Sequence, residues 1–270
     1  MSIDILESFV AGSGTSCADV IVAAPGVVGV VDGATAKPWD SAGGPSGERI
    51  AIELADVLAG LPRDFTAVEA VSRLTAHVAG MLAAASIRPG AGSGAAFAVV
   101  HLGARQIWRV GEANLMVNTQ LVGNRARGET IVARARALVI RALLADGASV
   151  EELQRVDAGR EAIYGVLKAL VSLRNRDVGG YMNAAVDGTP VPAPFLEIVD
   201  LPNSECEVVM TSDGYPTIAR TLAETEELLH LRLATDPLMI EEPPATKGWM
   251  VGQSSFDDRA FVRCLVPAIG

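Results

Sequence analysis

The sequence contains few of the residues that build thiol or imidazole sites. Its 270 residues include three cysteines and three histidines. The cysteines, Cys17, Cys206 and Cys264, are widely separated and odd in number, so they form neither a disulfide framework nor a zinc-binding motif. The histidines also lack metal-ligand spacing, which favours structural roles for them. The sequence therefore predicts a protein of a reducing compartment, with the cytoplasm as the expected location.

Positive charge and long hydrophobic runs are scarce as well. The 22 Lys and Arg residues are outnumbered by 32 Asp and Glu, which gives a formal net charge of −10. This balance argues against nucleic acid or an anionic membrane surface as the main partner. No stretch approaches the roughly 20 uninterrupted apolar residues of a membrane span. Residues 1–4 lack the positive charge and apolar segment of a secretory signal.

Half of the sequence is hydrophobic, and its apolar residues follow both strand-like and helix-like patterns. Ser46, and Thr66 with Glu69 three residues later, are typical helix N-terminal signals. The expected strands are residues 3–10, 19–24, 27–32, 95–102, 106–110, 115–118, 195–199, 207–211 and 260–266. The expected helices are residues 46–61, 66–86, 126–146, 150–173 and 221–234.

The order of these elements indicates the class of fold. Strands are grouped with strands and helices with helices, which favours an α+β fold of antiparallel sheets covered by helix pairs over a parallel doubly wound sheet. The three strands within residues 95–118 are joined by tight turns and are expected to form an antiparallel meander. No internal repeat or linker divides the chain, so residues 1–270 are expected to form a single domain.

A run of β-branched residues, 27–31, stops at Asp32, which is followed at once by Gly33. Such a run fits a strand that is buried on both faces. Glycine lets the backbone turn sharply and leaves its carbonyl uncovered. The strand end therefore presents a carboxylate and a bare carbonyl, which are oxygen ligands that Mg²⁺ and Mn²⁺ prefer. An Asp-Gly pair after a strand is also a common turn, so this pattern alone leaves both interpretations open.

The same pattern returns at the ends of other apolar runs. Asp213 with Gly214 follows one such run, Asp257 and Asp258 stand immediately before the last one, and Asp19 precedes another. Acidic residues at the ends of several strands can converge at one edge of a sheet. For Asp258 a solvated surface charge and a metal ligand remain equally open interpretations.

Taken in order, these motifs resemble those of the metal-dependent protein phosphatases, the type 2C serine/threonine phosphatases. The resemblance runs along nearly the whole chain and is carried by Asp19, Val31-Asp32-Gly33, Ser93-Gly94-Ala95-Ala96, Arg109-Val110-Gly111-Glu112-Ala113, Thr211-Ser212-Asp213-Gly214 and Ser255-Phe256-Asp257-Asp258. It implies a β-sandwich of two antiparallel sheets flanked by helix pairs, with two divalent ions, Mg²⁺ or Mn²⁺, at one end. The partner that it implies is a phosphoprotein or a small phosphate ester.

The resemblance also implies roles for individual residues. Asp32 bridges the two ions, the carbonyl of Gly33 binds one of them, and Asp213 with Asp257 binds the other. Asp19 acts from behind these ligands or through water. A two-ion centre makes hydroxide from bound water and stabilises charge on phosphoryl oxygens. The implied reaction is hydrolysis of a phosphomonoester by in-line attack of that hydroxide, with Asp32 and Asp213 as catalytic residues and no covalent enzyme intermediate.

The sequence departs from the family where the substrate phosphate is bound. Residues 14–18 lack the arginine that binds this phosphate in the family, and Ala18 stands in place of the early glutamate. Lys37 is the nearest candidate to replace the arginine, and Arg49 and Arg259 are alternatives. A lysine such as Lys37 is also typical of a solvent-exposed surface.

These departures support a second hypothesis about function. Loss of the arginine and the glutamate favours a catalytically weak or inactive relative that serves as a binding or regulatory module. Retention of Asp32, Gly33, Asp213 and Asp257 favours metal binding and therefore an enzyme. Glu112 replaces the aspartate of the family turn, and its greater length favours an ordinary turn residue.

Overall fold

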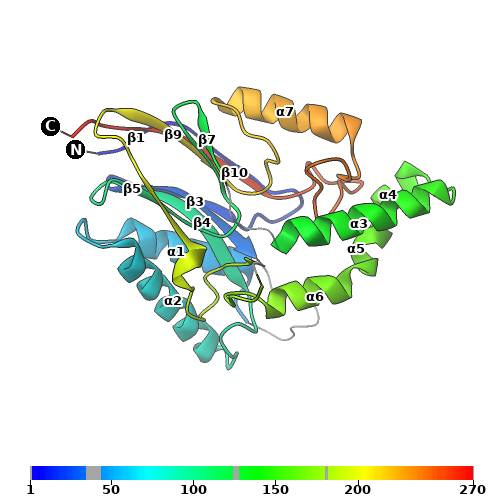
Figure 1. Ribbon diagram of the computed structural model, residues 1–270, viewed down its shortest axis with the longest axis horizontal. Helices are drawn as coiled ribbons and strands as arrows, with labels where there is room; N and C mark the ends of the chain where they lie inside the picture. The colour runs from blue at the N-terminus through cyan, green and yellow to red at the C-terminus, as the bar shows by residue number, and fades with distance from the viewer. Residues whose placement is uncertain (1, 35–43, 124–127, 180–181, 270) are drawn as a thin grey trace.

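The computed structural model describes residues 2–34, 44–123, 128–179 and 182–269, which form two antiparallel β-sheets with helices outside them (Figure 1). Within these residues each sheet has five strands. The first sheet comprises, in spatial order, β1 (Asp4–Ala11), β10 (Arg259–Val266), β9 (Cys206–Thr211), β6 (Asn114–Val117) and β7 (Gln120–Val122). The second comprises β2 (Asp19–Ala24), β3 (Val27–Ala34), β4 (Gly94–His101), β5 (Gln106–Val110) and β8 (Leu196–Asp200).

The main core lies between the two sheets. Because successive side chains of a strand point to opposite faces, Val28 and Val30 of β3 face the other sheet, where they share a cluster with Val208 and Val262. Val31 points the opposite way, into the helices. The valine run is therefore buried on both faces, as its composition predicts.

Helices α1 (Gly47–Ala59) and α2 (Ala67–Ala84) cover the outer face of the second sheet, where α1 packs on β2, β3 and β4 and α2 contacts α1 and β8. Both begin where the sequence predicts. The Ser46 side chain accepts a hydrogen bond from the Arg49 N–H, and Thr66 forms a capping box with Glu69. Helix α7 (Leu222–Thr235) covers the outer face of the first sheet through Leu229. The predicted α+β sandwich is thus confirmed.

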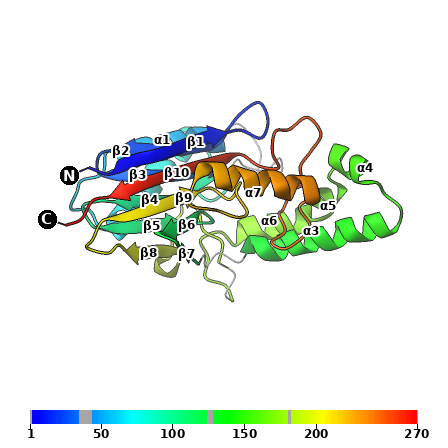
Figure 2. The same ribbon diagram turned by 90° about the horizontal axis from the view of Figure 1, so that it is seen from above.

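Four further helices lie beyond one end of the sheets (Figures 1 and 2). They are α3 (Gly128–Ala145), α4 (Val150–Arg155), α5 (Ala158–Ala162) and α6 (Tyr164–Ser172), and a 3₁₀ turn, η1 (Ala193–Phe195), precedes β8. The single helix expected over residues 150–173, with Gly159 as a weak point, is instead three helices. Helix α4 ends at Arg155, and Asp157 caps α5 by accepting a hydrogen bond from the Arg160 N–H. The helices described are too short or too polar to cross a membrane.

The expected three-strand meander is also wrong. β4 and β5 form a hairpin, but β6 joins the other sheet, where it pairs with β9 and β7. The crossing takes place at Gly111, whose φ of +92° disfavours any side chain. A Cβ at Gly111 would also lie 2.5 Å from the Cβ of Ala96. This corner places Glu112 at the end of the sandwich that faces α3.

Candidate active site

Two of the predicted carboxylates lie side by side on neighbouring strands. Asp19 at the start of β2 is directly opposite Asp32 near the end of β3. Residues directly opposite each other in an antiparallel pair point to the same face. Asp32 follows the Val28 and Val30 alternation, so both carboxylates point between the sheets, at the end of the core.

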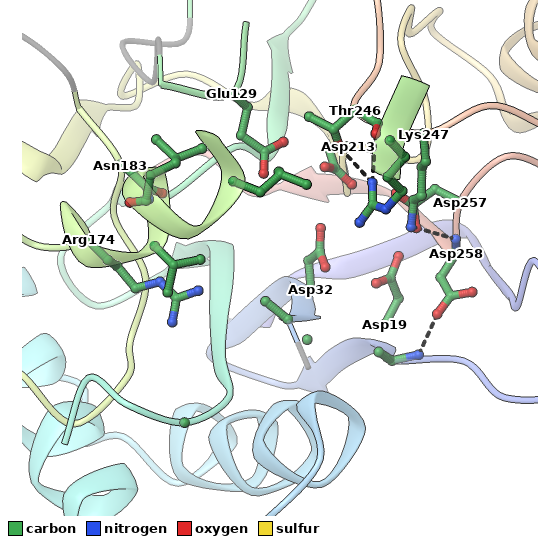
Figure 3. Close-up of a pocket in the computed structure, with 18 residues that line it drawn as sticks. Asp19, Asp32, Glu129, Arg174, Asn183, Asp213, Thr246, Lys247, Asp257 and Asp258 are labelled. Carbon is green, nitrogen blue, oxygen red and sulfur yellow. Dashed lines mark hydrogen bonds and ion pairs between the residues drawn. The ribbon is translucent and has the colours of Figure 1, made fainter. Parts of the chain in front are cut away.

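The other sheet brings two more carboxylates to the same place. Asp213 follows β9 and Asp257 precedes β10, and these two strands are paired. Burial, and then the charge of the nearby Asp32, raises the pKa of Asp213 well above its ordinary value. Figure 3 shows Asp19, Asp32, Asp213 and Asp257 directed toward one another from the two sheets. The predicted convergence of the acidic strand ends is therefore observed. The roles of these aspartates as metal ligands stay a prediction.

Glycines allow the backbone segments around these carboxylates to approach closely. A Cβ at Gly33 would lie 2.4 Å from the carbonyl oxygen of Gly47 at the start of α1, and the Gly33 N–H donates to the Ala18 carbonyl at 3.1 Å. A Cβ at Gly214 would lie 1.9 Å from the Asp258 carbonyl oxygen. Both Asp-Gly pairs therefore need glycine for packing. The turn expected at Gly33 is wrong, because β3 continues through it to Ala34 and Gly33 pairs with Ala95.

Asp258 fastens the loop between β1 and β2. Its Oδ1 accepts hydrogen bonds from the Ser13 N–H at 2.8 Å and the Ser13 hydroxyl at 2.9 Å, and its Oδ2 accepts one from the Ala18 N–H at 2.9 Å. These hydrogen bonds argue against a freely solvated surface charge, and a role of Asp258 as a metal ligand stays a prediction. Asp258 is a structural acceptor that holds the segment leading into Asp19.

Sequence reasoning missed one acidic residue of the site and favoured a turn role for another. Carboxylate oxygens of Glu112, Glu129 and Asp213 lie within 4.8 Å of one another, close enough to share a metal ion. Glu112 reaches this position from the corner between β5 and β6, despite its length. Glu129 lies in the first turn of α3, and the only signal in the sequence was an acidic residue beside a helix start.

Burial and mutual repulsion raise the pKa values of these carboxyls. Desolvation, and then the charges of Asp213 and Asp257, raise the pKa of Asp19 to about 8. Burial is also the first cause for Asp32, Asp213 and Glu112, whose pKa values are raised well above the ordinary range, with neighbouring carboxylates as the next cause. Asp19 Oδ2 is buried without a hydrogen-bond partner in the described chain. Such a cluster needs protons or cations, and its oxygen donors suit a hard divalent ion.

The four aspartates of the cluster, Asp19, Asp32, Asp213 and Asp257, line a cavity of about 260 Å³ between the sheet ends and α6. A second cavity, of about 360 Å³, adjoins it and shares Glu129, Asp213 and Asp257. The first also contains cationic side chains that the sequence did not single out, from Arg160, Arg174 and Lys247. They come from helices and a loop with no strand-end pattern, so only the tertiary structure identifies them.

Two of the three cations proposed from the sequence, Arg49 and Arg259, do not line the cavity, and the third stays a prediction. Lys37 lies outside the described residues. Arg49 is exposed on α1 and pairs with Glu53, and Arg259 pairs with Glu226 beside the ring of Phe9. Neither arginine lines the cavity, because each is turned toward a partner on the outer surface of its sheet or helix.

Lys247 pairs instead with a carboxylate of the cluster. Its ammonium group forms an ion pair with Asp257 Oδ1, which also accepts the Asp258 N–H at 2.8 Å. Burial opposes the charge of Lys247, but the neighbouring Asp257 outweighs it and raises the pKa of the lysine. The cluster therefore carries one built-in positive charge.

The fold is similar to that of solved serine/threonine phosphatases. The phosphatase PstP/Ppp of Mycobacterium tuberculosis gives a TM-score of 0.52 at 11% identity, over 100% of both chains. The catalytic domain of PstP in complex with two manganese ions gives 0.51 at 12% identity, over 98% of this chain and 100% of that one. Stp1 from Staphylococcus aureus gives 0.50 at 12% identity, over 100% of this chain and 98% of that one.

These likenesses show that the chain has the fold of the type 2C, or PPM, phosphatases, as the motifs suggested. No protein-family model matches the sequence, and no curated protein matches it at a significant level. The fold of this chain is therefore assigned from its similarity to the solved structures alone.

Proposed function

We propose that the protein is a divalent-metal-dependent phosphatase that hydrolyses phosphomonoesters with metal-activated water. The observation that carries the proposal is the convergence of four strand-end carboxylates, from both sheets, in one cavity of a type 2C phosphatase fold. The substrate is a phosphorylated serine or threonine of a protein, or a small phosphate ester.

Asp32, Asp213 and Asp257, with the carbonyl of Gly33, are the residues that would hold two Mg²⁺ or Mn²⁺ ions. Such ions, when bound, supply a hydroxide at neutral pH and neutralise charge on the phosphoryl oxygens. Asp19 lies behind Asp32 on the paired strand, where its unpartnered Oδ2 can accept a proton from water at the site. PstP, whose fold is similar, has been solved with two manganese ions.

Hydrolysis of para-nitrophenyl phosphate tests the proposal. We expect turnover that depends on added Mn²⁺, disappears with a chelator, and falls at least about a hundredfold in Asp32→Ala and Asp213→Ala, because a ligand to the catalytic ion is lost. Asp146→Ala, at an exposed position after α3, removes the same charge and should retain full activity. Loss of turnover in the control to the same extent, or turnover that ignores the chelator, would contradict the proposal.

One observation favours the second candidate, a binding or regulatory module with little activity. Lys247 already neutralises Asp257 and competes with a metal ion for it. Mn²⁺ that raises the melting temperature without supporting turnover would indicate the module, since a ligand that binds only the folded state stabilises it. If Mn²⁺ neither supports turnover nor raises the melting temperature, the protein has no metal site, whether it is an enzyme or a binding module.

A further inference from the structure

The cavity is lined by three cationic side chains, from Arg160, Arg174 and Lys247, and they differ in the partners that they already have. Arg160 donates through Nη1 to the Thr246 carbonyl at 2.7 Å, and Lys247 pairs with Asp257. Lys247 is tied to a carboxylate of the cluster and is therefore poorly placed to bind a second anion. Arg160 is held by a backbone carbonyl of the loop, and none of its nitrogens is among the buried atoms without a hydrogen-bond partner in the described chain.

Arg174 differs from both. It follows α6, lines the same cavity, and its side chain is only 12% exposed. Its Nη1 is buried and makes no hydrogen bond within the described residues. The ion-pair partner of this atom is Asp187 Oδ2 at 3.6 Å, which is beyond hydrogen-bonding distance and has no hydrogen-bond donor in the described chain either. A buried guanidinium nitrogen without a hydrogen bond costs free energy unless a ligand supplies an acceptor for it.

Asp187 holds Arg174 in place from behind. Its other oxygen, Oδ1, accepts hydrogen bonds from Asn175 Nδ2 at 3.0 Å, from the Thr189 N–H at 3.0 Å and from the Thr189 hydroxyl. Asn175 Nδ2 also donates to the Ala185 carbonyl at 2.7 Å. The carboxylate is therefore fixed, and the guanidinium beside it is pre-organised, so little side-chain entropy remains to be lost on binding.

We propose that Arg174 binds the phosphoryl oxygens of the substrate, in place of the arginine that residues 14–18 lack. The assignment rests on the phosphatase function proposed above. Arg174 lies across the cavity from Asp257 and Lys247 (Figure 3), so a phosphoryl dianion in the cavity has the carboxylate cluster on one side and the guanidinium on the other. The planar fork of arginine matches two phosphoryl oxygens at once. Asp187 is the positioning residue.

Binding of inorganic phosphate to the Mn²⁺-loaded protein, measured by calorimetry, tests the assignment. We expect Arg174→Met to weaken phosphate binding at least tenfold, to raise the KM for para-nitrophenyl phosphate similarly, and to leave the Kd for Mn²⁺ unchanged. Arg174→Lys should recover part of the affinity, because the charge remains while the fork is lost. Arg176→Met, at an exposed position two residues further on, removes the same charge and should bind phosphate normally.

The outcomes separate this assignment from the proposed function. Phosphate binding that falls in Arg174→Met but not in Arg176→Met supports the assignment, even if the wild-type protein shows no turnover and the phosphatase proposal fails. Turnover in the wild type with phosphate affinity in Arg174→Met within twofold of it overturns the assignment and leaves the phosphatase proposal standing. If Arg174→Met unfolds, an affinity for phosphate in Arg174→Lys equal to that of the wild type overturns it as well.

Discussion

At the scale of single residues, the close approach at Gly33 makes a direct prediction. A Cβ there would lie 2.4 Å from the Gly47 carbonyl oxygen, and backbone cannot move aside as a flexible side chain does. We expect Gly33→Ala to lower the free energy of unfolding by about 1–3 kcal/mol, as overpacking does, and to weaken Mn²⁺ binding. Gly26→Ala, in a turn with nothing within 4 Å, should change stability by less than about 0.5 kcal/mol. Equal urea midpoints for the two variants would contradict this reasoning.

The same scale shows which site residues the sequence could predict. Asp19, Asp32, Asp213 and Asp257 stand at strand ends, where a local pattern marks them and the sheets bring them together. Glu129, Arg160, Arg174 and Lys247 come from helix ends and a loop, whose positions depend on packing beyond the sheets. Apart from the helix start beside Glu129, the neighbouring residues carry no pattern that indicates a role. Sequence reasoning therefore did not select these four residues, and it proposed Lys37 as the phosphate-binding cation with Arg49 and Arg259 as alternatives.

At the scale of elements, one buried ion pair joins the outlying helices to the loop that carries Lys247. Arg136 of α3, whose side chain is 1% exposed, donates to both oxygens of Asp157 at 3.0 Å, and Asp157 also accepts the Gly248 N–H at 3.0 Å. Arg136 further donates to the Leu238 carbonyl at 2.9 Å. Removing the carboxylate would leave a buried guanidinium without its counter-charge.

We therefore expect Asp157→Ala to cost about 3–5 kcal/mol of stability. Hydrogen exchange should accelerate in α3, α5 and the loop before β10, while β3 and β4 stay protected, because only the former elements depend on this pair. Glu151→Ala, an exposed residue in the first turn of α4, serves as the control and should change little. Uniform acceleration over the whole chain, or none, would show that the pair does not hold these elements together.

Elements were predicted well where their signals are local and poorly where pairing is distant. Capping residues placed the starts of α1 and α2, and β2 was predicted from Asp19 to Ala24 as observed. The partner of β6 is β9, more than 80 residues further along the chain, and no turn signal encodes that choice. Gly111 could have indicated a corner, but a glycine in a short turn fits a meander equally well.

At the scale of the whole molecule, the acidic cluster should make stability depend on pH in the absence of metal. The pKa of Asp19 is raised from 3.8 to about 8, so the folded state binds its proton more tightly than the unfolded state does. Stability is then lost as pH rises from 3.8 toward 8, by at most about 1.4 kcal/mol per pH unit for this group.

We expect the melting temperature of the chelator-treated protein to fall between pH 5.5 and 8, and to fall less steeply in Asp19→Asn, which cannot ionise. Added Mn²⁺ should flatten the dependence, because the ion replaces the protons. Repulsion among the acidic groups of the whole chain, whose formal net charge is −10, also lowers stability as pH rises. This repulsion acts in the wild type and in Asp19→Asn alike, so it does not account for the difference between their slopes. A melting temperature that rises with pH in this interval would refute the prediction.

The walls of the cavity have two origins: its aspartates stand on the sandwich, whereas Glu129, Arg160, Arg174 and Lys247 belong to segments outside it. On the function proposed above, the reaction type and the choice of ester would therefore be set by different parts of one chain. We would then expect exchange of the outlying helices to change the phosphorylated compound that is bound, while the strand ends keep the same chemistry.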